Sequence, residues 1–263
     1  MNRVSLSIGD RKGKRMSDNK KSLDDYVTEI PAEDGVVVIY FSDLGPQVGW
    51  RTVFLVEYGG PLLIMTILLA FRLTIWGGKA KPLALNQWVL VACAYFHYIK
   101  RELESLFVHR FSKDTMPIKN IFINCTHYWV FFGAAMTLIL RPGYTPPAWL
   151  PAYGSYLFAG FFLFFAFMNG ACHMVLRNLR APGSTERGIP HGWGFGVISC
   201  ANYFWESMTW LMFAIPSQQW CAYAFWFFSS AIMCVWAKAK HDRYKKDFPE
   251  YPTIRKAMIP FIF

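Results

Sequence analysis

Apolar residues gather along the chain into six long segments, and short polar stretches separate them. Each segment has about the 20 residues that a helix needs to cross the core of a bilayer. The pattern predicts membrane helices over residues 50–76, 83–99, 121–140, 150–176, 192–215 and 220–236. Gly59-Gly60-Pro61 falls inside the first segment and would kink or break its helix, because proline lacks a backbone N–H.

The first 45 residues differ from the rest of the chain. Residues 1–35 are polar and show little periodicity, whereas residues 35–41 are short, rich in β-branched side chains and expected to form a strand. We therefore expect a polar cytosolic region over residues 1–45 and a membrane domain over residues 46–263. The predicted fold class is all-α and membrane-integral, with six or seven transmembrane helices in a bundle.

The composition supports a membrane protein. Hydrophobic residues make up 54% of the 263 residues and charged residues only 17%, whereas soluble proteins have roughly 25% charged residues. The net charge of +10 resides mainly in the loops after the second and fourth segments and in the C-terminal tail. Cytosolic loops of membrane proteins are enriched in Lys and Arg, so we expect both termini in the cytosol. Lys79 and Lys81 go against this orientation, because they lie in a loop on the other side.

Two classes of function are disfavoured. The basic excess does not indicate nucleic acid, because the chain has no basic low-complexity arm and no base-stacking motif. The six cysteines are scattered through apolar stretches without a C-x-x-C pair, so we expect neither disulfides nor a metal site.

Four polar residues recur at helical spacing where the fourth segment ends. Asn169, His173, Arg177 and Arg180 follow one another at steps of four, four and three, which places them on one face of a helix. Arginines and amides on one face suit an anionic ligand rich in hydrogen-bond acceptors, such as a nucleotide diphosphate. The alternative is a helix end whose arginines extend to the membrane surface.

The last two segments carry further polar residues. Asn202 and Glu206 lie one helical turn apart in the fifth segment, where a carboxylate costs about 2.5 kcal/mol or more and needs a polar partner. An Asn–Glu hydrogen bond that only packs helices is an equal alternative. Lys240 and Tyr244 share a face after the sixth segment, where they could bind a phosphate or simply hold the helix at the membrane surface.

A last group consists of isolated polar residues, namely Gln47, Glu57, His97 and Tyr98. A carboxyl beside a tyrosine in a dry pocket can hold a proton at neutral pH and polarise a carbonyl, although single residues of this kind are often structural. Nucleotide motifs of soluble proteins are missing, since residues 192–196 lack the spacing of G-x-G-x-x-G. A dinucleotide would have to be held by the membrane helices themselves.

These residues stand in longer motifs that resemble the steroid 5α-reductase superfamily. The motifs are Asn169-x-x-x-His173-x-x-Leu-Arg177-x-Leu-Arg180-x-Pro-Gly183, Ser199-Cys-Ala-Asn202-Tyr203-x-x-Glu206 and Tyr244-x-x-x-Phe248-x-x-Tyr251-Pro252. Three others are similar to the very-long-chain trans-2-enoyl-CoA reductases: Asp43-Leu-Gly-Pro-Gln-Val-Gly-Trp50, His97-Tyr-Ile-Lys-Arg101-x-Leu-Glu104 and Asn120-Ile-Phe-x-Asn124-Cys-Thr126. The resemblance extends from about residue 39 to the end.

The resemblance implies a multi-pass enzyme of the endoplasmic-reticulum membrane that completes the fatty-acid elongation cycle, including the supply of acyl chains to sphingolipids. Such an enzyme reduces the 2,3 double bond of a long-chain enoyl-CoA with NADPH. Its implied partners are membrane lipid, the elongase, the ketoacyl-CoA reductase and the hydroxyacyl-CoA dehydratase. The resemblance also implies that the polar N-terminal region is a truncated ubiquitin-like unit.

Roles for single residues follow from the resemblance by position. Gln47, Glu57 and Tyr203 match residues important for activity in these reductases, and Tyr98 matches the tyrosine that pairs with a glutamate at the substrate carbonyl in the steroid enzymes. The positions that match the NADPH pocket are Asn169, His173, Arg177, Arg180, Asn202, Glu206, Lys240, His241 and Tyr244. The steroid enzymes carry an acidic residue at the position of His173, so this contact differs.

The reaction requires a donor for the enolate that develops at the thioester. We hypothesise that Tyr203, or Tyr98 supported by Glu57, is this donor. Two alternatives stay open: a steroid or polyprenol double-bond reductase of the same superfamily, and a non-catalytic membrane scaffold of the elongation complex.

Overall fold

The computed structural model describes residues 4–8, 14–16, 24–25, 38–78, 81–111, 115–179 and 188–263. The chain divides into two compact units. The first comprises residues 1–53 and 113–123, and the second comprises residues 54–112 and 124–263. The division between residues 45 and 46 stays a prediction.

The described strands belong to the first unit. β1 (Val4–Ile8) pairs antiparallel with β2 (Lys14–Arg15) on one side and with β3 (Ile39–Asp43) on the other. β3 contains residues 39–41 of the strand predicted over residues 35–41; Val38 is described but lies outside it, and residues 35–37 are outside the described residues. β4 (Gln47–Gly49) pairs antiparallel with β5 (Thr115–Pro117). Each strand pairs by backbone hydrogen bonds with a segment distant in the sequence, and only folding brings those segments together.

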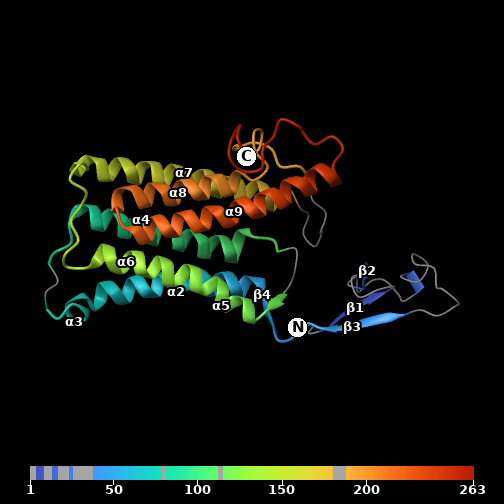
Figure 1. Cartoon of the computed structure of the whole chain (residues 1–263), viewed down its shortest axis with the longest axis horizontal. Helices are drawn as coiled ribbons and strands as arrows, with labels where there is room; N and C mark the ends of the chain where they lie inside the picture. The colour runs from blue at the N-terminus through green and yellow to red at the C-terminus, as the bar shows by residue number, and fades with distance from the viewer. Residues whose placement is uncertain are drawn as a thin grey trace. The chain divides into compact units, whose positions relative to one another are not determined.

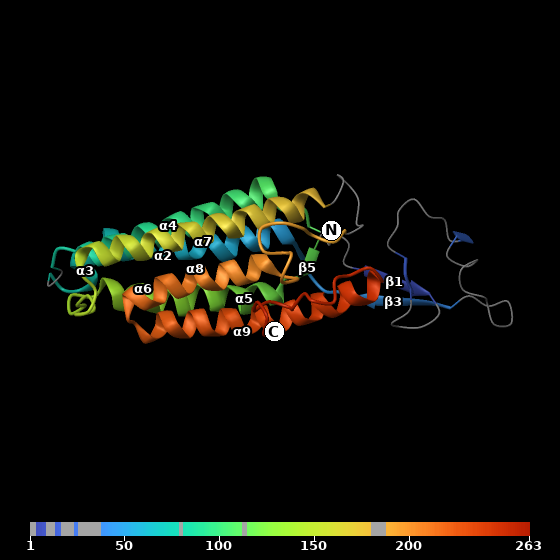
Figure 2. The ribbon, with the colours of Figure 1, turned by 90° about the horizontal axis from the view of Figure 1, so that it is seen from above.

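Helices make up the second unit, and their axes run side by side (Figures 1 and 2). They are α2 (Trp50–Ala70), whose first turn belongs to the first unit, α3 (Arg72–Ile75), α4 (Leu85–Leu103), the π-helix η1 (Glu104–Val108), α5 (Lys119–Cys125), whose residues 119–123 belong to the first unit, the π-helix η2 (Thr126–Phe131), α6 (Phe132–Leu140), α7 (Ala152–Asn178), α8 (Ala201–Ser217) and α9 (Trp220–Asp247). Helix α7 packs along α8, α8 packs along α9, and α4 contacts both α7 and α8. The helical positions agree with the predicted segments, and two boundaries differ.

The fifth helix is shorter than predicted. Residues 192–200 form turns, because Gly192, Trp193 and Gly194 have φ angles of +77°, +50° and +101°, which a right-handed helix cannot accommodate. This segment instead forms a parallel bridge between Ile198 and Lys256. The sixth helix is longer than predicted, since α9 continues to Asp247 and therefore carries the candidate residues near its end.

The first helix does not break at its proline. Helix α2 runs from Trp50 to Ala70 with Pro61 inside, so of the two predicted effects the break does not occur, and the kink stays a prediction. A proline in a membrane helix is tolerated where neighbouring groups satisfy the backbone carbonyl that it leaves without a donor.

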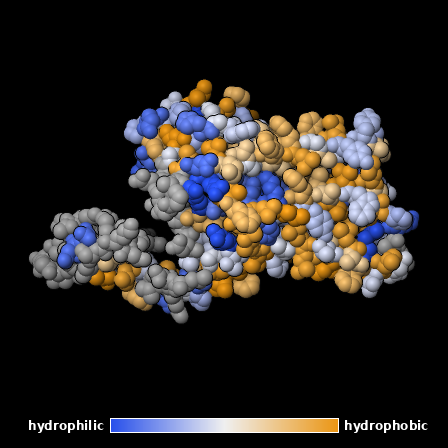
Figure 3. All heavy atoms as spheres, turned by 180° about the vertical axis from the view of Figure 1, so that it is seen from behind, coloured by the Kyte–Doolittle hydropathy of each residue, from blue (hydrophilic) through white to orange (hydrophobic). Residues whose placement is uncertain are grey.

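Among the described residues, four helical stretches are long and apolar enough to cross a membrane: Trp50–Ala70, Lys119–Leu140, Ala152–Asn178 and Trp220–Asp247. Apolar side chains dominate the face of the helical unit drawn in Figure 3. In the helical unit, large apolar side chains such as Leu63, Phe167 and Val235 are more than 60% exposed, which suits a surface in contact with lipid. The chain is therefore an all-α, multi-pass membrane protein, and the count of six or seven helices stays a prediction.

Aromatic side chains form the centre of the helical unit. Tyr98, Phe132, Trp210, Phe213 and Phe225 are buried in one cluster. The centroids of Tyr98 and Phe132 are 4.8 Å apart, and those of Trp210 and Phe225 are 4.9 Å apart, both in edge-on contact. The polar residues described next lie at one end of this core.

Candidate active site

A buried carboxylate joins the end of α4 to α7. Glu104, the first residue of η1, is 7% exposed. Its Oε1 lies 2.7 Å from Lys100 Nζ, and its Oε2 lies 2.7 Å from Arg101 Nη1 and 3.0 Å from His173 Nδ1. Because buried charges are costly unless they are paired, this arrangement fixes α4 and α7 to each other at this end of the bundle.

The electrostatics around Glu104 favour its ionised form. Burial alone would raise the pKa of the Glu104 carboxyl, but His173, Arg101 and Lys100 together hold this pKa well below its usual range. His109 follows η1 and behaves in the opposite way. Burial, aided by the Arg101 guanidinium, lowers the pKa of His109 to about 3, so this imidazole is neutral at physiological pH.

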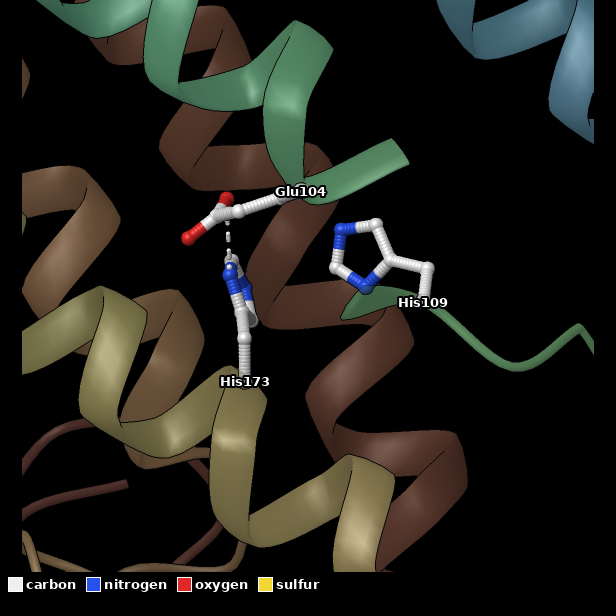
Figure 4. Close-up of side chains that lie close together, drawn as sticks. All are labelled: Glu104, His109 and His173. Carbon is white, nitrogen blue, oxygen red and sulfur yellow. Dashed lines mark ion pairs between the residues drawn. The ribbon is translucent and has the colours of Figure 1, made fainter. Parts of the chain in front are cut away.

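Glu104, His109 and His173 form a group with metal-ligand chemistry (Figure 4), since their ligand atoms all lie within 4.8 Å of one another. However, a guanidinium nitrogen already lies among them. Arg101 Nη1 is 2.7 Å from Glu104, 3.2 Å from His173 Nδ1 and 3.5 Å from His109 Nε2. The three side chains thus surround a cation of the protein itself rather than an open coordination position.

Two further chains of hydrogen bonds leave this group. Lys100 Nζ donates to Asn169 Oδ1 at 2.7 Å, and Asn169 Nδ2 donates to the carbonyl of Asn202 at 2.9 Å. On the other side, Arg101 Nη2 donates to the Tyr58 hydroxyl at 2.7 Å. Asn169, His173 and Asn202, all predicted from the sequence, therefore lie together. Asn169 bonds directly to Asn202, whereas Lys100 of α4 and Glu104 of η1 connect Asn169 to His173.

Glu206 has a polar partner, as its depth in the membrane segment requires. His97 Nε2 lies 3.0 Å from Glu206 Oε1, and Trp210 Nε1 donates to the same oxygen at 3.2 Å. Among the described residues, this carboxylate thus contacts His97 on α4 and Trp210 on its own helix, and not Asn202. His97 and Glu206 link α4 to α8 beside the aromatic core.

Tyr98 is fully buried, and its hydroxyl has no hydrogen-bond partner among the described residues. Its ring lies against Phe132, Trp210 and Tyr58, at centroid distances of 4.8, 5.6 and 6.4 Å. Glu57 does not bond to it, since the Glu57 carboxylate accepts a hydrogen bond of 2.6 Å from Asn124 Nδ2. The predicted direct support of Tyr98 by Glu57 is therefore not present in the described residues.

A second polar cluster lies between α8 and α9. Lys240 Nζ donates to the Tyr203 hydroxyl at 2.7 Å and lies 4.4 Å from the centre of the same ring. Within the described part of the chain, Lys240 pairs with no carboxylate. A cation held only by a phenol is well placed to bind an anion.

His241 and Tyr244 meet the C-terminal segment. The hydroxyl of Ser199 lies 2.6 Å from both His241 Nδ1 and the Tyr251 hydroxyl. Tyr244 stacks on Tyr251 with parallel rings at 5.3 Å. These contacts show that His241 is a buried structural partner of Ser199, in addition to the role that the resemblance gives it.

The remaining predicted residues are placed differently. Gln47 belongs to the first unit, where its amide nitrogen donates to the carbonyl of Leu44 at 2.8 Å and its oxygen accepts from Thr115 at 3.2 Å. Arg177 is half-buried at the end of α7. Arg180 lies outside the described residues.

Sequence reasoning did not single out several residues that hold the site together. Lys100 and Glu104 have the i, i+4 spacing of a helical ion pair, and Arg101 stands between them, so charge patterning could have found this group. Nothing in the local sequence connects Asn124 with Glu57, because they lie 67 positions apart.

A groove of about 370 Å³ lies between α4 with η1 and α7. Its lining combines aliphatic, aromatic and small side chains with two charged ones, which belong to Lys100 and Glu104. The lining residues are Phe96, Lys100, Glu104, Val108, Ala166, Phe167, Gly170, Ala171 and Met174. An apolar surface thus leads directly to the ion network.

Comparisons with known proteins agree with the resemblance. The family described as 3-oxo-5-alpha-steroid 4-dehydrogenase matches residues 114–263. A Schizosaccharomyces pombe protein described as an enoyl reductase is 46% identical over 224 residues, which cover 85% of this chain and 75% of that protein. The very-long-chain enoyl-CoA reductase of Dictyostelium discoideum is 42% identical over 225 residues, 85% of this chain and 74% of its own. A Caenorhabditis elegans protein described as a very-long-chain enoyl-CoA reductase is 37% identical over 259 residues, 95% of this chain and 82% of its own.

Proposed function

This chain belongs to the very-long-chain trans-2-enoyl-CoA reductases of the steroid 5α-reductase superfamily, and we propose that it reduces the 2,3 double bond of a long-chain trans-2-enoyl-CoA with NADPH. It is accordingly an oxidoreductase that acts on CH–CH groups and uses a nicotinamide cofactor. The proposal adds the long-chain substrate, NADPH as the cofactor and the residues that take part in the reaction.

The observation that carries the proposal is the buried Tyr98 hydroxyl without a partner. A buried hydroxyl that donates to nothing costs about 1–3 kcal/mol, so such a group in a native core calls for an acceptor that binds there. A thioester oxygen is an acceptor of this kind, and its demand for a donor increases as it gains negative charge. The apolar rings around Tyr98 would strengthen that hydrogen bond by excluding water.

The donor set at the helix ends fits an anionic dinucleotide. Neither Lys240 nor Arg177, at the end of α7, forms an ion pair with a carboxylate among the described residues. We propose that these two cations, with Arg180, bind phosphate groups, and that Asn169, His173, Asn202, Glu206, His241 and Tyr244 complete the pocket. When bound there, the nicotinamide group supplies a hydride.

The residues of this chain then have three tasks. Reduction at C3 places negative charge on the thioester oxygen, which Tyr98 or Tyr203 stabilises by donating a hydrogen bond. The other tyrosine provides the proton that C2 receives. Lys240 orients the phenol of Tyr203 for this task, because its Nζ donates a hydrogen bond to the phenol oxygen at 2.7 Å.

We propose that the groove between α4 and α7 receives the hydrocarbon chain of the substrate. Its apolar lining suits an acyl chain that arrives through the membrane, and its charged end at Lys100 and Glu104 lies where the polar thioester would begin. We also propose, from the family and from the charge of the loops, that the protein resides in the endoplasmic-reticulum membrane with both termini cytosolic. Its proposed partners there are the elongase, the ketoacyl-CoA reductase and the hydroxyacyl-CoA dehydratase.

The test is an acceptor and cofactor screen on the purified protein in detergent or nanodiscs. Oxidation of NADPH and of NADH is followed with a long-chain trans-2-enoyl-CoA, a 4-ene-3-ketosteroid and a polyprenol. Turnover of the enoyl-CoA with NADPH supports the proposal, while turnover of the steroid or polyprenol alone would replace it with that reductase. Dinucleotide binding without turnover of any acceptor would leave the non-catalytic scaffold.

A further inference from the structure

Helix α2 contains a proline one turn after Glu57. In a regular helix the N–H of residue 61 would donate to the carbonyl of residue 57, but Pro61 has no N–H. The Glu57 carbonyl therefore needs another donor, because unpaired backbone groups inside a membrane protein are costly. Glu57 itself is 3% exposed.

Trp129 supplies this donor from a different helix. Its indole Nε1 lies 3.3 Å from the carbonyl oxygen of Glu57 and 3.2 Å from that of Val56. Trp129 belongs to the π-helix η2, and π-helical turns commonly redirect side chains at functional sites.

Gly60 makes the approach of the indole possible. A Cβ atom at this position would lie only 1.9 Å from Trp129 Nε1, far inside van der Waals contact. The neighbouring Gly59 is different, since its Cβ would meet Glu102 Oε1 at an ordinary 3.4 Å. Gly60 and Pro61 thus form a notch in α2. Gly60 leaves room for the indole ring, and Pro61 leaves the Glu57 carbonyl without its helical N–H donor.

The same segment also binds the Glu57 side chain. Asn124 lies near the end of α5, just before η2, and donates from Nδ2 to Glu57 Oε1 at 2.6 Å. Glu57 therefore accepts two hydrogen bonds from residues 124–129. The Asn124 amide donates to its carboxylate, and the Trp129 indole donates to its backbone carbonyl. A residue needed only for helix packing would not require both contacts.

We propose that Trp129 is a positioning residue that sets the carboxylate of Glu57 for the reaction by fixing the backbone of α2 at the Gly60–Pro61 notch. This inference rests on the proposed catalytic role of Glu57. Trp129 itself touches neither substrate nor cofactor in this account.

The first variant removes the donor and keeps an aromatic ring. Trp129→Phe should lower kcat by about 2- to 10-fold, the equivalent of one neutral hydrogen bond. The KM for enoyl-CoA should change little, and the pH dependence of kcat should shift because the Glu57 carboxylate is displaced. In a Glu57→Gln background, Trp129→Phe should have no further effect on kcat.

A rescue separates the hydrogen bond from packing. Pro61→Ala restores a backbone N–H that can reach the Glu57 carbonyl, so kcat of the double variant Pro61→Ala/Trp129→Phe should return to near the wild-type value. Gly60→Ala should reproduce the defect of Trp129→Phe by displacing the indole, while the matched control Gly59→Ala should leave kcat unchanged.

Each outcome decides the inference. Failure of Pro61→Ala to restore kcat, or additive effects of Trp129→Phe and Glu57→Gln, would overturn it. Thermal unfolding of the same variants keeps it separate from the proposed function. If the wild type reduces no enoyl-CoA, the proposed function fails. The unfolding midpoints would still test whether the Trp129 indole replaces the N–H that Pro61 lacks, and additive changes in the Pro61 and Trp129 variants would refute this.

Discussion

Replacing Tyr98 with phenylalanine removes one oxygen atom from the centre of the aromatic core. The hydroxyl is fully buried and has no partner among the described residues, so its removal should not cost stability. It should relieve up to about 1–3 kcal/mol of desolvation penalty, which leaves the unfolding midpoint unchanged or raised. The kcat of Tyr98→Phe should nevertheless fall. Loss of one oxyanion donor lowers kcat by about 10²–10³, equivalent to about 2.7–4 kcal/mol of transition-state stabilisation.

The assay compares single-turnover NADPH oxidation with thermal unfolding in the same detergent. Tyr144→Phe is the matched control, because the hydroxyl of Tyr144, in the loop after α6, is also buried but donates a hydrogen bond to Asn86 Oδ1 on α4. That variant should lose about 1 kcal/mol of stability and keep its kcat. A Tyr98→Phe protein that is destabilised but active would refute the reasoning. Near-normal kcat in both Tyr98→Phe and Tyr203→Phe would refute the proposed donors altogether.

Three further predictions concern charged and titratable side chains of the candidate site. Glu104→Gln leaves buried cations without their carboxylate and should cost about 3–5 kcal/mol of unfolding free energy. Asp242→Asn, in a solvent-exposed pair, should leave the free energy of unfolding nearly unchanged, and denaturant titration distinguishes the two variants. His109 has a pKa of about 3 against an ordinary 6.5, so its contribution to stability is present above pH 6.5 and about 2 kcal/mol of it is lost by pH 5. The unfolding midpoint of His109→Gln should therefore fall less steeply over this range, and an unchanged slope would contradict the assignment. Lys240→Met should raise the Kd for NADPH in a binding titration and lower kcat through Tyr203, and an unchanged Kd would exclude Lys240 from the pocket.

The helices could be predicted from the sequence because each carries its own signal. A long apolar segment satisfies its backbone hydrogen bonds internally, so α2, α7 and α9 are recognisable without reference to the rest of the chain. The same applies to the alignment of Asn169 and His173, which depends only on helical periodicity.

Boundaries failed where local geometry overrides composition. Residues 192–200 are apolar enough to extend α8, yet the positive φ angles at residues 192–194 end any helix there. Conversely, Pro61 is a local signal for a break, and a donor from a distant helix cancels it.

The sequence by itself determined the class of protein, its helical segments and most of the polar residues proposed for the site, because these follow from hydrophobicity, spacing and motif. Only the tertiary structure decided which polar groups are bonded to one another. Glu206 pairs with His97, His173 with Glu104, and Glu57 with Asn124, each across two helices. Partners of this kind are fixed by how helices pack and turn against each other, and a hydroxyl left without a partner, such as that of Tyr98, becomes visible only when every neighbour is in place.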